Sequence, residues 1–203
     1  MTELVSKEKE KNILNAARKR FAHYGFSKVT MDEIAGDVEM GKASLYYYFP
    51  TKEDLFRAVI AQEQDEFTKN IEAILQQPAT AAQKLNEYVE QRLKYFQVLL
   101  NLGTLSVHSY FDLKSVFRKL FEDFEAHELD LLKKIFDEAK SNKEFNPELS
   151  DEITKVFLHM LQGLRLRIIR LIKEQRSEEE NYKTLETEMK IATDIFIKGL
   201  KNK

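Results

Sequence analysis

Residues that interrupt helices are scarce in this chain. Its 203 residues include only 6 glycines and 3 prolines, while 33% of them are charged. A sequence with so few turn-forming residues favours long helices joined by short connections. No sustained alternation of Val, Ile and Thr between turn residues indicates a strand. The expected fold class is therefore all-α.

The composition also limits the chemistry. The chain has no cysteine, which excludes a disulfide scaffold, a thiolate zinc site and a cysteine nucleophile. Its four histidines are never one helical turn apart, so we expect no metal site. The sequence contains no nucleophile elbow, no phosphate loop and no distinctive carboxylate pair. We therefore expect neither an enzyme nor a bound cofactor.

Charge and hydropathy indicate where the chain acts. The first ten residues are polar and lack the apolar core of a signal peptide. Three arginines interrupt the most apolar stretch, residues 158–172. We expect a cytoplasmic protein without a membrane partner. The formal net charge is −2, yet basic residues crowd positions 7–28, which fits contact with a polyanion and equally fits a solvated helix face.

Apolar spacing and capping signals place the helices. Ile13, Ala17 and Phe21 recur at helical spacing and predict the buried face of a helix over residues 6–24, which Gly25 ends. Thr80 with Gln83 predicts a capping box at the start of another helix. Asn146 followed by Pro147 predicts the start of a late helix that reaches residue 175. About nine helices are expected in all, and six of them lie near residues 30–38, 42–49, 52–75, 80–102, 113–135 and 177–200.

The two short helices, joined by a tight turn and preceded by a supporting helix, are the parts of a helix-turn-helix. Thr30 with Glu33 predicts a capping box at the start of the first. In the second, Leu45 and Phe49 are four residues apart and predict the core face. The opposite face, with Lys42 and its neighbours, would enter the major groove. Tyr46, Tyr47 and Tyr48 could instead fill a core, although three consecutive side chains cannot all point inward.

Two segments of this region resemble the DNA-binding domain of TetR/AcrR-type regulators. They are residues 30–35, TMDEIA, and residues 42–55, KASLYYYFPTKEDL. The resemblance extends to the supporting helix and covers about a quarter of the chain. It implies an N-terminal three-helix helix-turn-helix domain over residues 1–51 and a C-terminal helical ligand-binding and dimerisation domain over residues 52–203. The helix over residues 52–75 would connect the two.

The resemblance further implies a homodimer that binds a double-stranded DNA operator with two-fold symmetry. Its implied DNA-binding residues are Thr30, Tyr47 and Lys52 at the phosphates, Gly41, Lys42, Ala43 and Tyr46 near the bases, and Ser44 beside them. The expected function is that of a repressor released from its operator by a small apolar or amphipathic effector. The alternative is a DNA-bound adaptor whose helical body binds a protein.

One residue departs from the family pattern. The turn of the helix-turn-helix usually contains Gly where this chain has Glu39. If its backbone is left-handed, Glu39 carries strain of ~1 kcal/mol. Its carboxylate would also lie near the DNA, so we expect Glu39 to tune the affinity for the operator.

The C-terminal body has two predicted sites. Residues 153–172 are apolar over a wide arc, which predicts a partner helix on each side. The predicted dimer interface comprises Phe157, Leu161, Leu164, Ile168, Leu171, Ile191 and Ile195. The predicted effector pocket, aromatic with a few polar groups, comprises Arg92, Phe96, His108, Phe117, Phe121, Phe124, His127, His159 and Gln162. These side chains also fit a filled core or positions that reach water.

Overall fold

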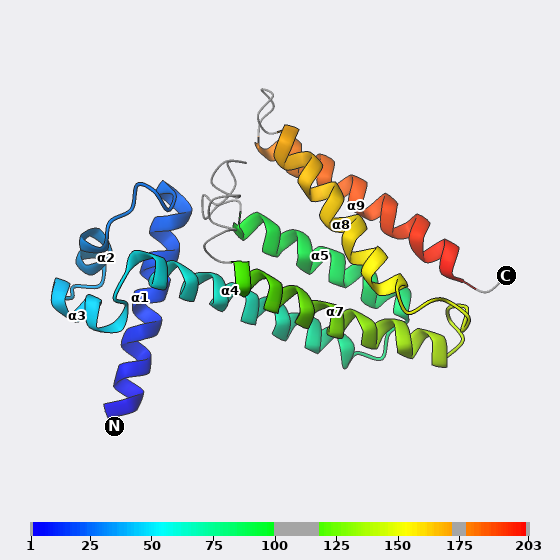
Figure 1. Ribbon diagram of the computed structural model, residues 1–203, viewed down its shortest axis with the longest axis horizontal. Coiled ribbons are helices and arrows are strands. Elements are labelled where there is room, and N and C mark those ends of the chain that lie inside the picture. Colours follow the sequence, from blue (N-terminus) through cyan, green and yellow to red (C-terminus); the bar gives the residue numbers. More distant parts are fainter. Residues whose placement is uncertain (1, 100–117, 172–177, 202–203) are drawn as a thin grey trace. The chain divides into compact units, whose positions relative to one another are not determined.

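The computed structural model describes residues 2–99, 118–171 and 178–201, and within these ranges helices are the only regular secondary structure (Figure 1). The all-α prediction is confirmed. No helix of the described part combines the length and apolarity that crossing a lipid bilayer requires. The helices are α1 (Thr2–Tyr24), α2 (Met31–Asp37), α3 (Lys42–Tyr48), α4 (Lys52–Leu75), α5 (Ala81–Leu99), α7 (Arg118–Ser141), α8 (Ile153–Leu171) and α9 (Glu178–Leu200).

The chain forms two compact units. Of the described residues, the first unit comprises 2–65, 96–99 and 118–120, and the second comprises 66–95, 121–171 and 178–201. Helix α4 contributes residues to both units. Its first half, up to Asp65, belongs with the helix-turn-helix, so the unit boundary lies within the helix that was predicted to connect the two domains and not at residue 52.

Aromatic packing explains why the start of α4 belongs to the first unit. Phe56 of α4 is buried, and its ring centroid lies 5.0 Å from that of Phe21 and 4.8 Å from that of Phe26. Ile13 and Ala17 of α1 are also fully buried, as the helical spacing predicted. This core joins α1, the loop after it and α4.

The end of α1 follows the sequence signal. Gly25 has a φ of 77°, and its N–H donates to the Phe21 carbonyl at 2.9 Å. Glycine adopts this left-handed conformation without the steric penalty of a Cβ atom. The predicted cap is confirmed, although α1 begins at Thr2 and not near residue 6.

Two helix starts in the second unit show where local signals suffice and where they fail. The capping box before α5 is present, since the Gln83 N–H donates to Thr80 Oγ1 at 3.3 Å and the Thr80 N–H donates to Gln83 Oε1 at 2.9 Å. The predicted helix start at Pro147 is wrong, because α8 begins at Ile153. The Asn146 side chain instead accepts from the Glu148 N–H at 3.0 Å and closes a turn.

Candidate nucleic-acid interface

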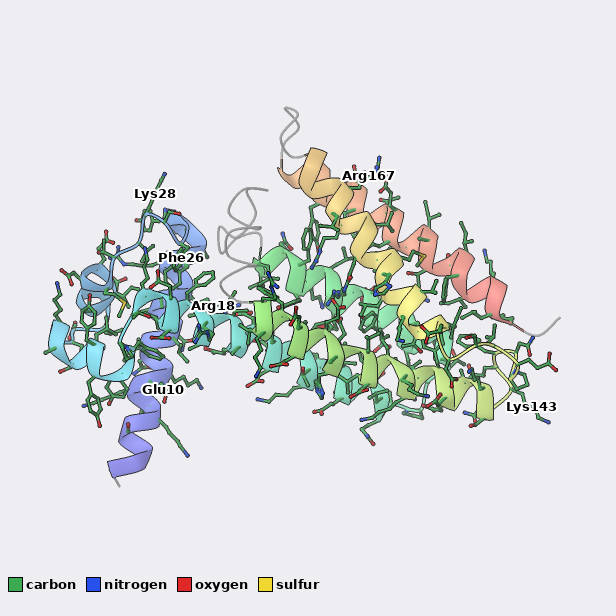
Figure 2. All side chains as sticks on the ribbon, viewed as in Figure 1. Glu10, Arg18, Phe26, Lys28, Lys143 and Arg167 are labelled. Atoms are coloured by element: carbon green, nitrogen blue, oxygen red, sulfur yellow. The ribbon has the colours of Figure 1, made fainter. Side chains whose placement is uncertain are left out.

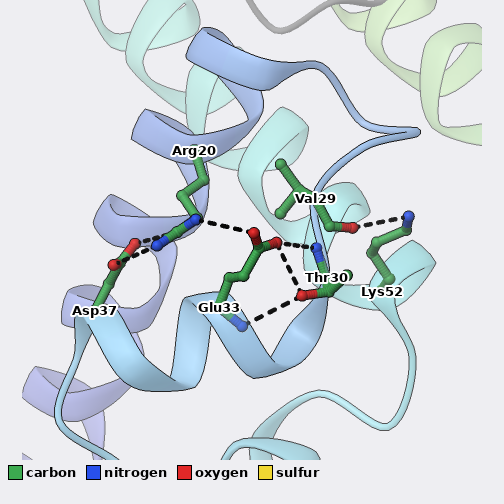
Figure 3. A network of polar contacts seen from close by, with 6 residues as sticks. All are labelled: Arg20, Val29, Thr30, Glu33, Asp37 and Lys52. Carbon is green, nitrogen blue, oxygen red and sulfur yellow. Dashed lines mark hydrogen bonds and ion pairs between the residues drawn. The ribbon is translucent and has the colours of Figure 1, made fainter.

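A capping box fixes the start of α2. The Glu33 N–H donates to Thr30 Oγ1 at 3.3 Å, and the Thr30 N–H donates to Glu33 Oε2 at 2.8 Å (Figure 3). Val29 and Ile34 are both buried on either side of it. The predicted box is confirmed. These contacts set the direction in which α2 leaves the loop after α1.

The turn between α2 and α3 is a Schellman motif. The Glu39 N–H donates to the Gly36 carbonyl at 3.2 Å, and the Met40 N–H donates to the Ala35 carbonyl at 2.9 Å. Glu39 has a φ of 51°, which confirms a left-handed residue at the position where glycine is usual. A non-glycine side chain is strained here by about 1–2 kcal/mol.

Helix α3 separates a core face from an outer face. Leu45 is fully buried and Phe49 is 6% exposed, as their spacing predicted. Tyr47 is 84% exposed and is therefore not core filler, while Tyr48 is half-buried. Six more of the predicted DNA-binding residues are exposed, namely Thr30, Gly41, Lys42, Ala43, Ser44 and Tyr46. The helix thus presents most of the predicted DNA-binding residues on one accessible surface.

An arginine of α1 forms ion pairs with two residues of α2. The Arg20 guanidinium donates to both carboxylate oxygens of Asp37, one of them at 2.7 Å, and lies 3.5 Å from Glu33 Oε1 (Figure 3). Arg20 holds the pKa of Asp37 below its usual range. The bond from the Thr30 backbone N–H lowers the pKa of Glu33 in the same way.

The sequence did not reveal the ion pairs of Arg20 with Asp37 and Glu33. In the sequence, Arg20 is only one of the basic residues at positions 7–28. It is 17 positions from Asp37, a separation that belongs to no local helical pattern.

Both lysines of the predicted interface have partners within the chain. Lys42 Nζ lies 2.8 Å from Asp32 Oδ2, a contact that raises the pKa of Lys42. Lys52 Nζ donates to the carbonyls of Phe26 and Val29, each at 3.0 Å, and lies 4.5 Å from the centroid of the Phe26 ring. Lys52 therefore secures the loop that precedes α2.

The second unit contains a buried polar network at one predicted effector residue. Arg92 Nη1 donates to Glu128 Oε1 at 2.6 Å, and the Tyr88 hydroxyl donates to the same oxygen at 2.6 Å. All three side chains are buried. Burial raises the pKa of the Glu128 carboxyl, and the Arg92 guanidinium opposes that rise. The charge of Arg92 is thus compensated within the chain.

The other predicted pocket residues do not all converge. The half-buried ring of Phe124 packs with Tyr95 at 5.2 Å and with Phe67 at 5.5 Å between centroids. Gln162 Nε2 donates to Glu125 Oε2 at 2.9 Å. Phe96 is buried, Phe121 is half-buried, His127 and His159 are exposed, and His108 and Phe117 lie outside the described residues.

The residues of the predicted dimer interface are partly buried within the second unit and partly exposed. Phe157 and Leu161 are fully buried inside the second unit, whereas Ile191 and Ile195 are 55% and 66% exposed. Leu164 is half-buried, and the side chains of Ile168 and Leu171 lie outside the described part. Among the described side chains of α8, the large apolar ones that are exposed are Val156 and Leu166, which do not belong to the predicted interface.

Known proteins resemble the chain in sequence and in fold. Residues 13–59 match the family described as "Bacterial regulatory proteins, tetR family". A transcriptional regulator from Cytophaga hutchinsonii, known from a crystal structure, has 39% sequence identity to this chain. The two structures match with a TM-score of 0.84 over 94% of this chain and 97% of that one.

Curated relatives match over shorter regions. The HTH-type transcriptional regulator RutR of Escherichia coli K12 is 35% identical over 86 residues, which are 42% of this chain and 40% of RutR. The HTH-type transcriptional regulator YuxN of Bacillus subtilis is 34% identical over 106 residues, 49% of this chain and 36% of YuxN. The chain therefore spans less than half the length of these two relatives.

Proposed function

We propose that this chain, which belongs to the TetR family of DNA-binding transcriptional regulators, is a homodimeric repressor that a small effector releases from a two-fold symmetric operator. The observation that carries the proposal is the outer face of α3. Tyr47 is 84% exposed there, while Leu45 on the opposite face is fully buried. A helix held by one face and open on the other is what entry into the major groove requires.

The surface of α3 supplies the appropriate chemistry. Gly41 and Ala43 are small, so the backbone can approach the bases closely. Tyr46 and Tyr47 offer hydroxyls to phosphates and ring surface to thymine methyls. Lys52 adds a positive charge at the start of α4 and holds the loop that carries Thr30. Thr30 and Lys52 would accordingly meet the DNA backbone at one place, because Lys52 Nζ bonds the carbonyl of Val29, the residue before Thr30.

DNA binding is tested with the double variant Lys42→Ala/Tyr47→Ala. The operator is first selected from a random DNA library, and affinity is then measured by fluorescence anisotropy at fixed salt. We expect at least a tenfold loss, because a phosphate contact and a base contact are removed together. Lys133→Ala on α7, whose side chain is 49% exposed, is the control for losing a lysine. Unchanged affinity of the double variant would refute the site.

Exposed apolar residues on α8 and α9 support the dimer. One face of α8 exposes two apolar side chains, Val156 and Leu166. The exposed residues His159 and Gly163 lie between them on the same face, at intervals of three and four residues. Helix α9 packs beside α8 and exposes Ile191 and Ile195. A second copy that covers both helices would form a four-helix interface.

Oligomeric state tests the dimer directly. Ile195→Asp places a charge in the proposed interface, so we expect light scattering after size exclusion to give the mass of a monomer. Lys190→Ser changes an exposed side chain of α9 on another face and should remain dimeric. A wild-type chain of 23.9 kDa that elutes as a monomer would contradict the homodimer.

The aromatic cluster of Phe67, Tyr95 and Phe124 supports an apolar or amphipathic effector in the second unit. Phe67 belongs to α4, and α4 also contributes to the first unit. A shift of α4 on effector binding would therefore reach the helix-turn-helix through one continuous helix. A coupling of about 1–3 kcal/mol is enough for such a switch.

One observation favours the adaptor as a second candidate. Arg92 is neutralised by Glu128, so within the described core its charge is not available to the polar group of an effector. A compound that raises the melting temperature and releases the operator would support the effector. Operator binding that no compound alters, together with a helical body that captures a defined protein, would support the adaptor.

A further inference from the structure

We propose that Asp32 and Lys42 act as a pair that reads one G·C base pair in each operator half-site. Lys42 donates to guanine O6 or N7, and Asp32 accepts from the N4 amino group of cytosine. The inference rests on the proposed function, since it requires α3 in the major groove. It adds a specificity-determining residue, Asp32, which lies on α2 outside the predicted DNA-binding set.

The geometry brings the two side chains together at the open end of the motif. Asp32 is the second residue of α2, and Lys42 is the first residue of α3. Their charged atoms lie 2.8 Å apart, and each side chain is 61% exposed. A Cβ atom built on Gly41, next to Lys42, would meet nothing within 4 Å. The pair therefore links the first turns of two helices and remains accessible to a ligand.

The pair presents a donor beside an acceptor. The ammonium of Lys42 can only donate hydrogen bonds, and the carboxylate of Asp32 can only accept them. The major-groove edge of a G·C pair offers two acceptors on guanine, followed by one donor on cytosine. An A·T pair places its single donor between two acceptors, and these flanking acceptors would repel a carboxylate that approached the donor. The pattern of the side-chain pair therefore fits G·C better than A·T.

Charge argues against a phosphate contact for this pair. The ion pair has no net charge, so it gains little from the phosphate backbone, and the Asp32 carboxylate would be repelled by phosphate oxygens. Base edges, in contrast, offer partners to both groups. The pair would thus contribute discrimination between sequences more than overall affinity.

The lysine is oriented before DNA arrives. Lys42 Nζ lies 6.0 Å from the centroid of the Tyr46 ring and 2.8 Å from Asp32. A long side chain held between two partners loses less conformational freedom on binding than one that is free in solution. Asp32 therefore has two tasks, which are to position Lys42 and to contact cytosine.

The test is selection of bound DNA from a random library with the wild type, Asp32→Asn and a matched control. The control is Asp137→Asn on α7, where Lys133 and Asp137 form another ion pair of 2.8 Å with half-exposed side chains. The wild type and the control should require G·C at one position of each half-site. In Asp32→Asn, the preference for G·C over A·T at that position should fall about fivefold or more, with the other positions unchanged. Equal melting curves show that the variants fold alike.

Two results would overturn the proposal while leaving the proposed function intact. One is an Asp32→Asn variant that selects the same site with undiminished discrimination. The other is a Lys42→Ala variant that weakens binding to all sequences equally and reduces the salt dependence by about one counterion, which is the signature of a phosphate contact. A wild-type protein that selects no sequence would refute the proposed function itself.

Discussion

Replacing Glu39 by glycine tests the strain in the turn of the helix-turn-helix, and the chain provides its own control. The end of α7 forms a second Schellman motif with a non-glycine residue, Lys143, at a φ of 60° (Figure 2). The Lys143 N–H donates to the Lys140 carbonyl at 3.1 Å, and the Glu144 N–H donates to the Ala139 carbonyl at 2.9 Å. The two turns thus share their backbone geometry, and only one belongs to the predicted DNA-binding surface.

The expected gain is the difference between two opposing terms. A left-handed residue with a side chain costs about 1–2 kcal/mol. Glycine removes this strain but lowers the stability by roughly 0.5–1 kcal/mol, because the unfolded chain gains conformational freedom. A net gain of about 0.5–1 kcal/mol remains, which in a protein of this size raises the Tm by about 1–4 °C. We expect Glu39→Gly and Lys143→Gly to show this rise.

DNA affinity separates strain from charge. Glu39→Gln removes the carboxylate and keeps the strained backbone. We expect Glu39→Gln and Glu39→Gly to bind the operator about twofold more tightly at low salt, as expected for removing one like charge at ~10 Å through water. Lys143→Gly should leave DNA affinity unchanged. The measurements are thermal melting by circular dichroism and anisotropy titration with the selected operator.

The reasoning would be refuted if both glycine variants melted at or below the temperature of the wild type. Such a result would mean that the left-handed residues carry no relievable strain. A rise for Lys143→Gly alone would show that the Glu39 side chain stabilises its turn by more than the strain costs.

Three further predictions concern buried and bridging polar groups. Asp37→Asn should lower the Tm by up to about 3 °C at neutral pH. Because Arg20 depresses the pKa of Asp37, the ion pair stabilises the protein above the ordinary Asp pKa of 3.8, and this stabilisation is lost as the pH falls below that value. Urea unfolding should therefore show the difference in stability between wild type and Asp37→Asn disappear in acid. Arg92→Ala should cost about 3–5 kcal/mol in urea unfolding by leaving the Glu128 carboxylate uncompensated, and Arg92→Met with Glu128→Leu should recover most of it. Lys52→Met keeps the apolar stem but leaves two carbonyls without their donor, so scanning calorimetry should show a Tm lower by roughly 2–4 °C.

The sequence predicted those helix boundaries whose causes are local. Thr30 with Glu33 and Thr80 with Gln83 form their capping boxes from residues three positions apart. Asn146 shows the limit of such signals. Its side chain can cap a helix or close a turn two residues ahead, and the sequence of the next residues does not distinguish the two.

The sequence also predicted the two faces of α3, but it did not reveal the partners of the interface residues. Leu45 and Phe49 mark the core face because helical periodicity alone decides it. The bonds of Lys52 to carbonyls 23 and 26 positions earlier depend on how the loop after α1 folds back. The ion pair of Lys42 with Asp32 likewise depends on how α2 meets α3. Contacts of this kind follow from tertiary packing and have no local pattern.

These pairings change what the charge distribution of the sequence means. The basic residues near the N-terminus suggested a surface that attracts a polyanion. One of them, Arg20, instead neutralises Asp37 and lies beside Glu33, while Lys42 neutralises Asp32. Partners of this kind offset the repulsion between carboxylates and the phosphates of DNA. The acidic residues of α2 are therefore compatible with DNA binding, and the positive field that DNA would meet is weaker than a count of N-terminal lysines and arginines indicates.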